Sequence, residues 1–234
     1  MDTNSNKYTL IYSVVMVFIV AVLLTLVALS LQPRQQQNIE IEKKRNILAT
    51  LNIETNAKNA EELYEKFIVE EIAVNSLGQI LENIDVFNID MKAELRKDSK
   101  DQILPVFVAK TDDGNTQYIF AMSGKGLWGV IWGYVALKED FTTIYGAYFD
   151  HASETPGLGA EIATKTYQNQ FKDKVIFNEN GDFVSIKVIK GGAGDNPSAV
   201  DAVSGGTITS NGLSDMLNTC LSAYLNFINE NKNN

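Results

Sequence analysis

The first hydrophobic feature of the chain is an uninterrupted apolar run close to its start. From Leu10 to Leu31 the sequence carries no charged residue. In lipid, a single segment can make all of its backbone hydrogen bonds internally only as a helix. At ~1.5 Å per residue the run reaches about 33 Å, enough for a hydrocarbon core of roughly 30 Å. It predicts a transmembrane helix over 10–31, behind a short tail at 1–9. The alternative is a cleaved signal peptide, because Ala28-Leu29-Ser30 offers a small-residue cleavage site, but such a peptide has an apolar run of only ~7–15 residues.

A polar segment with helical spacing follows the apolar run. Ile41, Leu48 and Leu51 recur at helical intervals among charged residues, which predicts a helix that leaves the membrane. Two more helices are expected around 60–73 and around 77–81. We interpret 32–102 as a helical connector and the start of a soluble domain.

From residue 103 onward the pattern becomes that of β-strands. Runs rich in β-branched and aromatic residues predict strands over 103–110, 116–122, 130–137 and 142–149. A DDGN turn joins the first two strands as a hairpin. A helix is expected over 161–171, and a second hairpin is expected to turn at Asn180-Gly181, where both residues can take positive φ.

The chain ends in an amphipathic helix. Its apolar residues recur at i, i+3, i+4 and i+7 and comprise Leu213, Met216, Leu217, Cys220, Leu221, Tyr224, Leu225 and Ile228. This spacing places Cys220 in the core. Together these patterns predict an α+β fold, in which a single N-terminal transmembrane helix is followed by a mainly antiparallel sheet domain with flanking helices, the domain proper covering 103–234.

Composition limits the chemistry. With 20 Lys and Arg against 29 Asp and Glu, the formal charge is −9, which opposes nucleic acid as a partner because such binding needs a basic face. One cysteine cannot form an intrachain disulfide. A single histidine and a single thiol also exclude a metal site built from several imidazoles or thiolates, so we expect no metal site.

Charges beside the apolar run leave the orientation of the chain open. Lys7 lies before the run, whereas Arg34, Lys43, Lys44 and Arg45 lie beyond it. A count of these charges places the large domain in the cytoplasm, but the positive-inside rule is a weak guide when a whole domain follows the helix.

Three glycines, Gly124, Gly126 and Gly129, match the spacing of a dinucleotide-binding motif. That motif needs a helix after the glycines and βαβ alternation around them, whereas a strand-like run follows here. We therefore interpret the glycines as turn positions or as places of close chain approach. Leu127 and Trp128, which lie between them, are candidates for core packing or for the walls of a flat ligand's pocket.

A second loop, HASETPGLGA, contains His151 and Glu154 beside several hydroxyl residues. No nucleophile-elbow motif accompanies them, so a hydrogen-bonded structural histidine is the expected role and a hydrolytic triad the alternative. The glycines of TPGLG allow tight bending and a close approach of the backbone to a ligand.

The most informative segment is AVDAVSGGTITSNGLSD, where two glycines and the hydroxyls of Ser204, Thr207, Thr209 and Ser210 lead into the last helix. Exposed amides at a helix start favour an anion, and glycines let a phosphate approach the backbone. Helix capping by Thr209, Ser210 or Asn211 is the alternative interpretation.

This loop resembles the covalent flavinylation motif D-x-x-S/T-G-A-T, and reads DAVSGGT here. The resemblance assigns Asp201, Ser204 and Gly205 to the motif and implies that Thr207 carries FMN through a phosphoester. Gly206 replaces the usual alanine, which removes one methyl group.

The wider chain resembles the C subunit of the sodium-translocating NADH:quinone oxidoreductase. The segments that carry the resemblance occur in order: NKYT, LQPRQQQNIEIEKKRNIL, GKGLWG, HASETPGLGA and SGGT. The resemblance implies an electron-carrying subunit with one covalent FMN, anchored by a single pass in the bacterial inner membrane among other subunits, with its soluble domain in the periplasm. It also implies a flavin transferase that installs FMN from FAD, and a flavin pocket that includes Thr155, Gly157, Leu158 and Gly159.

Under this interpretation the chain needs no catalytic acid, base or nucleophile, because FMN exchanges electrons while the protein sets its position. The isolated chain would be an electron carrier, and the whole complex the enzyme. Two further hypotheses remain open from the sequence: the G subunit of the related ferredoxin:NAD oxidoreductase complex, and a membrane-anchored flavin-binding redox module. A hydrolase that uses His151 is a third class.

Overall fold

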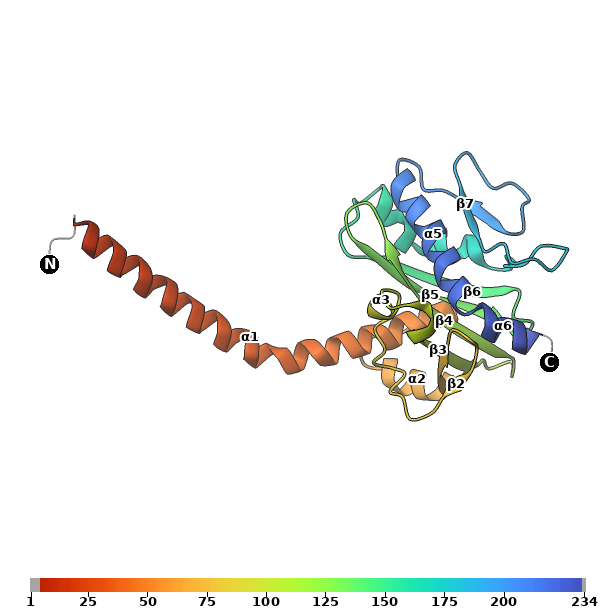
Figure 1. Ribbon diagram of the computed structural model, residues 1–234, viewed down its shortest axis with the longest axis horizontal. Helices are drawn as coiled ribbons and strands as arrows, with labels where there is room; N and C mark the ends of the chain where they lie inside the picture. The colour runs from red at the N-terminus through yellow and green to blue at the C-terminus, as the bar shows by residue number, and fades with distance from the viewer. Residues whose placement is uncertain (1–4, 233–234) are drawn as a thin grey trace. The chain divides into compact units, whose positions relative to one another are not determined.

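The computed structural model describes residues 5–232. It divides between Lys43 and Lys44 into two compact units, which we describe separately. The first unit is the greater part of α1, a helix that runs from Asn6 to Thr50 (Figure 1). None of the residues in the most apolar stretch of this helix is buried. By length and composition α1 can therefore cross a membrane.

Polar side chains in the apolar part of α1 bond to the backbone of the same helix. The Thr25 hydroxyl donates to the Ala21 carbonyl at 2.8 Å and the Ser30 hydroxyl to the Val27 carbonyl at 2.8 Å. Pro33 lies inside the helix without ending it, although it has no N–H for the preceding turn. The predicted membrane helix and connecting helix are thus one element. Residues 6–9 of the predicted tail are helical as well, and residues 1–4 lie outside the described part of the chain.

The second unit is built on a sheet. Within the described residues, six strands pair antiparallel in the order β2-β1-β3-β4-β5-β6. Their bounds are Ile68–Asn75 for β1, Ile80–Leu81 for β2, Ile103–Lys110 for β3, Thr116–Lys125 for β4, Val130–Lys138 for β5 and Ile144–His151 for β6. The four strands predicted from residue 103 onward and the α+β class are confirmed.

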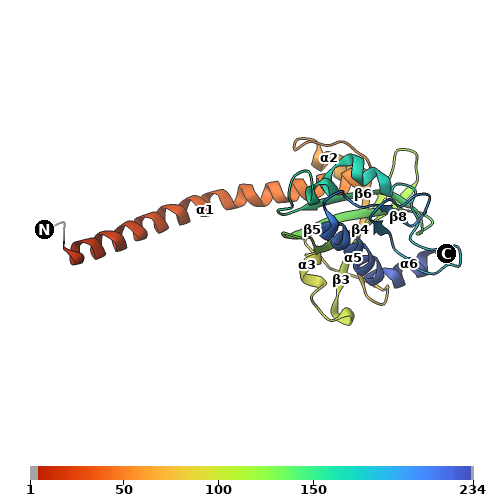
Figure 2. The same ribbon diagram turned by 90° about the horizontal axis from the view of Figure 1, so that it is seen from above.

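Both faces of the sheet are covered by helices. On one face lie α5 (Thr207–Ala223) and α6 (Leu225–Lys232), where the rings of Phe120 and Tyr224 have centroids 4.9 Å apart (Figure 1). The last turns of α1 lie against the other face (Figure 2), where a Cβ added to Gly146 would meet the Thr50 carbonyl at 2.3 Å. Burial on both faces explains why these strands read as nearly continuous apolar runs.

The helices predicted over 60–73 and 77–81 are wrong in part. The first, α2, covers only Ala60–Phe67; the chain then enters β1, which pairs along most of β3 with Glu71 opposite Phe107. The second is a turn followed by β2. Two adjacent glutamates in β1 continue the helical pattern of α2. Only the pairing with β3, which is distant in the sequence, makes this segment a strand.

The hairpin predicted at Asn180-Gly181 is only partly present. Gly181 turns with φ of 83°, but Asn180 does not take positive φ, and a single antiparallel bridge joins Phe177 to Phe183. Beyond it, β7 (Lys187–Ile189) pairs in parallel with β8 (Ala199–Asp201). The amides of Val184 and Ser185 both donate to the Ile176 carbonyl, at 2.9 and 3.2 Å, and Ser185 takes a φ of 57°, so the ladder is irregular at this point.

The helix predicted over 161–171 is divided into three short pieces, η2 (Gly159–Ala163), α4 (Lys165–Gln168) and η3 (Asn169–Phe171). The division occurs at Thr164, which is extended and whose side chain accepts from the Tyr167 amide to cap α4.

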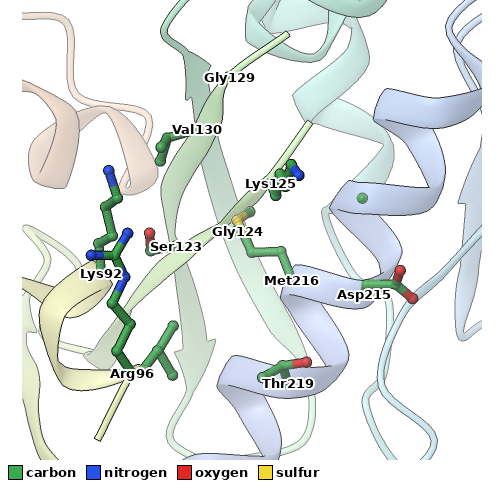
Figure 3. A pocket seen from close by; sticks show the side chains of 12 residues that line it. Lys92, Arg96, Ser123, Gly124, Lys125, Gly129, Val130, Asp215, Met216 and Thr219 are labelled. Carbon is green, nitrogen blue, oxygen red and sulfur yellow. The ribbon is translucent and has the colours of Figure 1, made fainter. Parts of the chain in front are cut away.

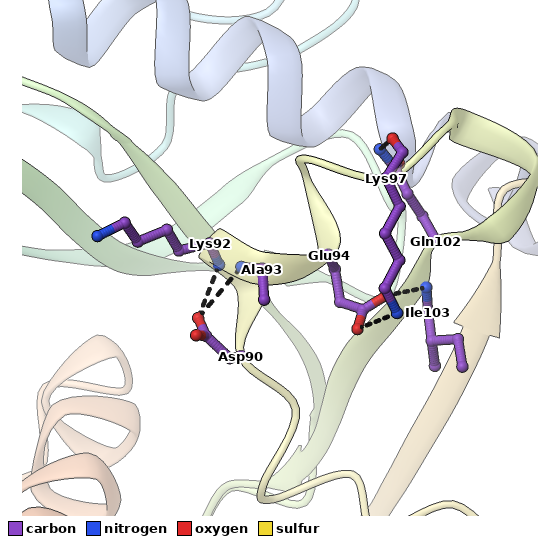
Figure 4. Close-up of polar contacts among 7 residues, drawn as sticks. All are labelled: Asp90, Lys92, Ala93, Glu94, Lys97, Gln102 and Ile103. Atoms are coloured by element: carbon purple, nitrogen blue, oxygen red, sulfur yellow. Dashed lines mark hydrogen bonds and ion pairs between the residues drawn. The ribbon is translucent and has the colours of Figure 1, made fainter.

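Two short elements before β3 were not predicted, α3 (Met91–Glu94) and η1 (Ser99–Asp101). Asp90 caps α3 by accepting from the Lys92 amide at 3.0 Å (Figure 4). At its other end the Glu94 carboxylate accepts from Lys97 at 2.7 Å and from the Ile103 amide at 2.9 Å. These contacts fix α3 beside the start of β3.

Candidate functional site

The first turn of α5 begins at Thr207, immediately after the two glycines of the SGGT loop. Gly205 takes a φ of 74°, a left-handed conformation that favours glycine. The Gly206 amide then donates to the Val203 carbonyl at 3.1 Å, and Gly206 is the N-cap residue of the helix. The Thr207 side chain is exposed, so the loop presents this hydroxyl to solvent at a helix start.

No side chain caps α5. The N-cap Gly206 has none to offer, and within residues 5–232 no acceptor is bonded to the amides of Thr207, Ile208 or Thr209. Side-chain capping of α5 is therefore absent, and the capping interpretation is wrong. Free amides at the start of a 17-residue helix favour a phosphate there.

The hydroxyls expected to cap the helix have other partners. Ser210 accepts a hydrogen bond from the Val203 amide at 3.0 Å, which holds the preceding loop against the helix. The Thr209 hydroxyl donates to the Glu154 carboxylate at 2.5 Å. Both side chains are buried, and neither accepts from the first three amides of α5.

The TPGLG loop lies directly against the SGGT loop. A Cβ added to Gly205 would meet Leu158 Cδ2 at 2.5 Å, and one added to Gly206 would meet the Gly159 amide at 3.3 Å. Within the loop, the Thr155 carbonyl accepts from the Leu158 amide at 3.1 Å. Gly157 takes a φ of 73°. The TPGLG loop, which the resemblance places close to the flavin, thus lies beside the turn that carries Thr207.

The GKGLWG loop, between β4 and β5, reaches the same place. The Trp128 amide donates to Glu154 Oε1 at 2.8 Å, and the Ser153 hydroxyl donates to the Trp128 carbonyl at 3.1 Å. No helix follows these glycines, because β5 begins at Val130. The dinucleotide-binding interpretation is excluded, and close chain approach explains the glycines.

Large apolar side chains are exposed on all three segments. Leu127 is 45% exposed, Trp128 66%, Leu158 42% and Ile208 58%. Exposed apolar side chains that gather at one site mark a surface for a ligand or a partner. These four provide apolar walls close to the free amides of α5.

Two residues of the DAVSGGT motif have a different environment. Asp201, at the end of β8, accepts from the Ala193 amide at 2.7 Å and so closes a neighbouring glycine-rich turn. Ser204 lines a cavity of about 560 Å³ together with Gly157, Glu161 and Tyr167. Glu161 Oε1 in turn accepts from the Gly157 amide at 3.1 Å.

The remaining reactive residue types have structural roles. His151 ends β6, and its Nδ1 accepts from the Glu154 amide at 3.2 Å, as expected of a structural histidine. Cys220 is fully buried, its thiol donating to the Ser123 carbonyl at 3.4 Å. Burial raises the pKa of the Cys220 thiol to about 11, so the thiolate is disfavoured at neutral pH.

A separate cavity of about 650 Å³ lies between α3, the end of β4 and α5 (Figure 3). Lys92 and Arg96 stand at one side and Met216 at the other (Figure 3). Gly124 forms part of its lining, and a Cβ there would meet Met216 Cβ at 2.6 Å. None of the residues assigned to the flavin motif lines this cavity.

Among residues 5–232, no group of three or more His, Cys, Asp or Glu side chains could hold a metal ion. The residue that the sequence did not assign to the site is Glu154. Its role depends on contacts to Trp128 and to Thr209, which are 26 and 55 positions away. In the sequence, only its position next to the glycines of TPGLG could have indicated a role in the site.

Comparison with known proteins agrees with this geometry. A family described as the FMN-binding domain matches residues 126–222. The C subunit of the Na(+)-translocating NADH-quinone reductase of Haemophilus ducreyi is 32% identical over 91% of this chain and 88% of its own length. Its counterpart in Vibrio parahaemolyticus is 28% identical, over 91% of this chain and 89% of its own length.

A solved structure is also similar. The crystal structure of the C subunit of the Na(+)-translocating NADH-quinone reductase from Parabacteroides distasonis superposes with a TM-score of 0.78 and 42% identity. The match covers 85% of this chain and 96% of the Parabacteroides chain.

Fold and site together define an FMN-binding domain that follows a helix long enough to cross a membrane. Within that class, the chain belongs to the family of the C subunit of the Na(+)-translocating NADH-quinone reductase, an oxidoreductase complex. The family named from the sequence is confirmed. The G-subunit and hydrolase alternatives are set aside.

Proposed function

We propose that this chain carries one FMN, bound covalently to Thr207, and relays electrons through it within the sodium-translocating complex. The observation that carries the proposal is the uncapped start of α5, where an exposed threonine hydroxyl adjoins amides with no acceptor among the described residues. A phosphate esterified to Thr207 would accept from these amides and benefit from the helix dipole. FMN supplies the exchange of electrons.

The attachment transfers the FMN phosphoryl group from a phosphoanhydride to a hydroxyl. The Thr207 oxygen bonds to the phosphorus of the FMN half of FAD, the phosphoanhydride bond to AMP breaks, and the hydroxyl proton leaves with the released AMP. No electron is exchanged in this step. Thr207 lines neither the cavity beside Ser204 nor the one beside Met216, so FAD would have to be presented to its exposed hydroxyl from outside. A separate flavin transferase as a partner agrees with this arrangement.

The protein's own side chains would form the surface on which the flavin ring rests. Leu127, Trp128 and Leu158 expose apolar atoms on two loops next to the turn that carries Thr207, and a flat conjugated ring buries such atoms efficiently. Gly157 and Gly159 keep the TPGLG loop narrow beside it.

Polar residues of the same loops would complete the pocket. The Thr155 carbonyl closes the turn of the TPGLG loop, and the Ser204 hydroxyl lies in the adjoining loop. Asp201 acts in this proposal by holding the neighbouring glycine turn.

The helix α1 would anchor the chain in the inner membrane by a single pass, in contact with lipid and with the other subunits. The positively charged residues after the apolar run favour the opposite orientation, but they are a weak guide when a large domain follows the helix. We therefore follow the resemblance to the family and infer that the soluble domain is periplasmic. Protease added to spheroplasts should digest the domain. Digestion only after lysis would contradict this orientation.

Mass spectrometry of the full chain from its native host tests the covalent link. The wild-type chain should be heavier than its polypeptide by FMN less one water, with the increment on the peptide that contains Thr207. Thr207→Ala should have the bare polypeptide mass. Thr219→Ala is the matched control, because Thr219 is an exposed hydroxyl residue on the same helix, and it should retain the flavin. A colourless wild-type chain of bare mass would end the proposal.

A further inference from the structure

Glu154 is the only carboxylate among the buried residues of the described chain, and it is 4% exposed. An ionised carboxylate taken out of water is costly unless hydrogen bonds replace its hydration. Both of its oxygens have a donor. Oε1 accepts from the Trp128 amide at 2.8 Å, and Oε2 accepts from the Thr209 hydroxyl at 2.5 Å. One side chain thus joins the GKGLWG loop to the first turn of α5.

Two glycines make room for this carboxylate. A Cβ added to Gly126 would lie 2.5 Å from Glu154 Oε1, and one added to Gly159 would lie 2.4 Å from Oε2 and 2.4 Å from Thr209 Oγ1. Neither glycine has a positive φ, so backbone conformation does not require glycine at these positions. The space that the carboxylate occupies explains why the GKGLWG loop and the TPGLG loop each have a glycine at the position next to it.

The contact to Thr209 also sets the direction of Thr207. Residues two apart on a helix point about 200° away from each other around its axis. Because Thr209 is fixed inward on Glu154, Thr207 on the same turn is directed outward, where it is exposed.

We propose that Glu154 is the positioning residue of the flavin site: it fixes the loop that carries Trp128, the loop that carries Leu158 and the turn that carries Thr207 relative to one another. This inference rests on the proposed role of Thr207. Glu154 acts through these three segments. Its geometry, and not its charge, is the property that the flavin depends on.

The test compares Glu154→Ala with Glu154→Gln in the complete complex from the native host. Glutamine can keep both hydrogen bonds, since its oxygen accepts from the Trp128 amide while its NH₂ donates to the Thr209 hydroxyl oxygen. Alanine removes both. The readouts are the fraction of chain that carries FMN, the visible spectrum of the flavin and its midpoint potential. We expect Glu154→Ala to shift the spectrum and the potential and to lower the flavin content severalfold, with Glu154→Gln close to wild type.

Asp140→Ala is the matched control. The Asp140 carboxylate accepts from the amides of Thr142 and Thr143 at 2.9 and 2.8 Å, in the turn between β5 and β6. Its loss should lower stability without changing the flavin. If Glu154→Ala does not accumulate, Thr209→Val against Thr209→Ser decides, because only serine keeps the hydroxyl that binds Glu154.

Three outcomes are distinguishable. A wild-type spectrum and potential in Glu154→Ala, or in Thr209→Val, would overturn the inference. An equal shift in Glu154→Gln and Glu154→Ala would also overturn it, because charge would then be the property that matters. A wild-type chain with no flavin on Thr207 would instead refute the proposed function.

Discussion

Trp128 is the largest side chain that the site exposes. Its backbone amide makes the hydrogen bond that holds the loop, and its ring is left open to solvent. The residue is 66% exposed, whereas its backbone N–H is held by Glu154. A substitution of the ring should therefore leave the backbone of the loop in place.

We predict that Trp128→Ala raises the fluorescence of the bound flavin, because an indole stacked on the ring quenches it. The free energy of unfolding should change by about 0.5 kcal/mol or less, as for other exposed positions. Fluorescence and urea denaturation of the flavin-loaded chain measure both quantities. Trp128→Phe, which retains an aromatic ring, should lie between. Unchanged fluorescence in Trp128→Ala would remove Trp128 from the pocket.

Gly206 occupies the motif position at which alanine is usual, and its surroundings show what an alanine would meet. A Cβ there would lie 3.1 Å from Val203 Cβ and 3.3 Å from the Gly159 amide, which is tight but within reach of small shifts. Its φ of −104° suits any residue.

Gly206→Ala should therefore keep the flavin and lower the free energy of unfolding by about 1 kcal/mol. Gly205→Ala is the contrasting variant, since its φ of 74° is strained for alanine and the Cβ would displace Leu158. It should lose more stability and part of its flavin. The reverse order, measured by denaturation and intact mass, would contradict this account of the loop.

At the scale of elements, Tyr224 connects the two terminal helices to the sheet. It lies fully buried where α5 gives way to α6, and its hydroxyl donates to the Pro105 carbonyl of β3 at 2.8 Å. Burial raises the pKa of the Tyr224 phenol well above its usual range.

Tyr224→Phe should lower the free energy of unfolding by about 1–2 kcal/mol, because the buried Pro105 carbonyl loses its donor. Urea denaturation measures the change. Tyr145→Phe is the control, since the Tyr145 hydroxyl makes no hydrogen bond within residues 5–232, and it should be close to neutral. Flavin content should stay unchanged, as Tyr224 lies at the opposite end of α5 from Thr207. An equal effect in both variants would contradict the assigned bond.

The elements also show where sequence patterns are sufficient. Strands β3 to β6 are predictable because each is a run of apolar and β-branched residues with a local turn signal. β1 is not, because Glu70 and Glu71 continue the pattern of α2 and only β3, more than 30 residues away, selects an extended conformation. The parallel pair of β7 and β8 was missed for another reason, because each strand is only three residues long and carries little strand pattern of its own.

The same distinction applies to the site. The SGGT and TPGLG loops are recognisable because their glycines form compact motifs. Glu154 is not, because its two partners come from a loop before it and a helix well after it. A motif can indicate which residues meet a ligand, whereas the side chain that holds several motifs together becomes visible only in the folded chain.

At the scale of the whole molecule, the boundary between Lys43 and Lys44 separates two compact units that differ in what stabilises them. Residues 6–43 form an exposed helix that is apolar from Leu10 to Leu31, and residues 44–232 form a domain with its own core. We therefore expect the helix to need lipid or detergent, and the domain to be stable in water.

We predict that the full chain stays in membranes washed with alkaline carbonate and needs detergent for release, because its apolar helix is transferred from water to lipid. The chain from Lys44 onward should be monodisperse in buffer without detergent, as judged by gel filtration. Release of the full chain by carbonate alone would contradict a spanning helix. Aggregation of the shorter chain would show that the helix contributes to the fold of the domain.

The buried position of Cys220 has a practical consequence. It is the chain's one cysteine, it is shielded by β4 and α5, and its proton is held tightly. The natural cysteine should therefore not react with a thiol label. A single cysteine introduced at a chosen surface position could carry a spin label or fluorophore without first removing Cys220, and movements of this protein among its neighbours could be followed through that one substitution.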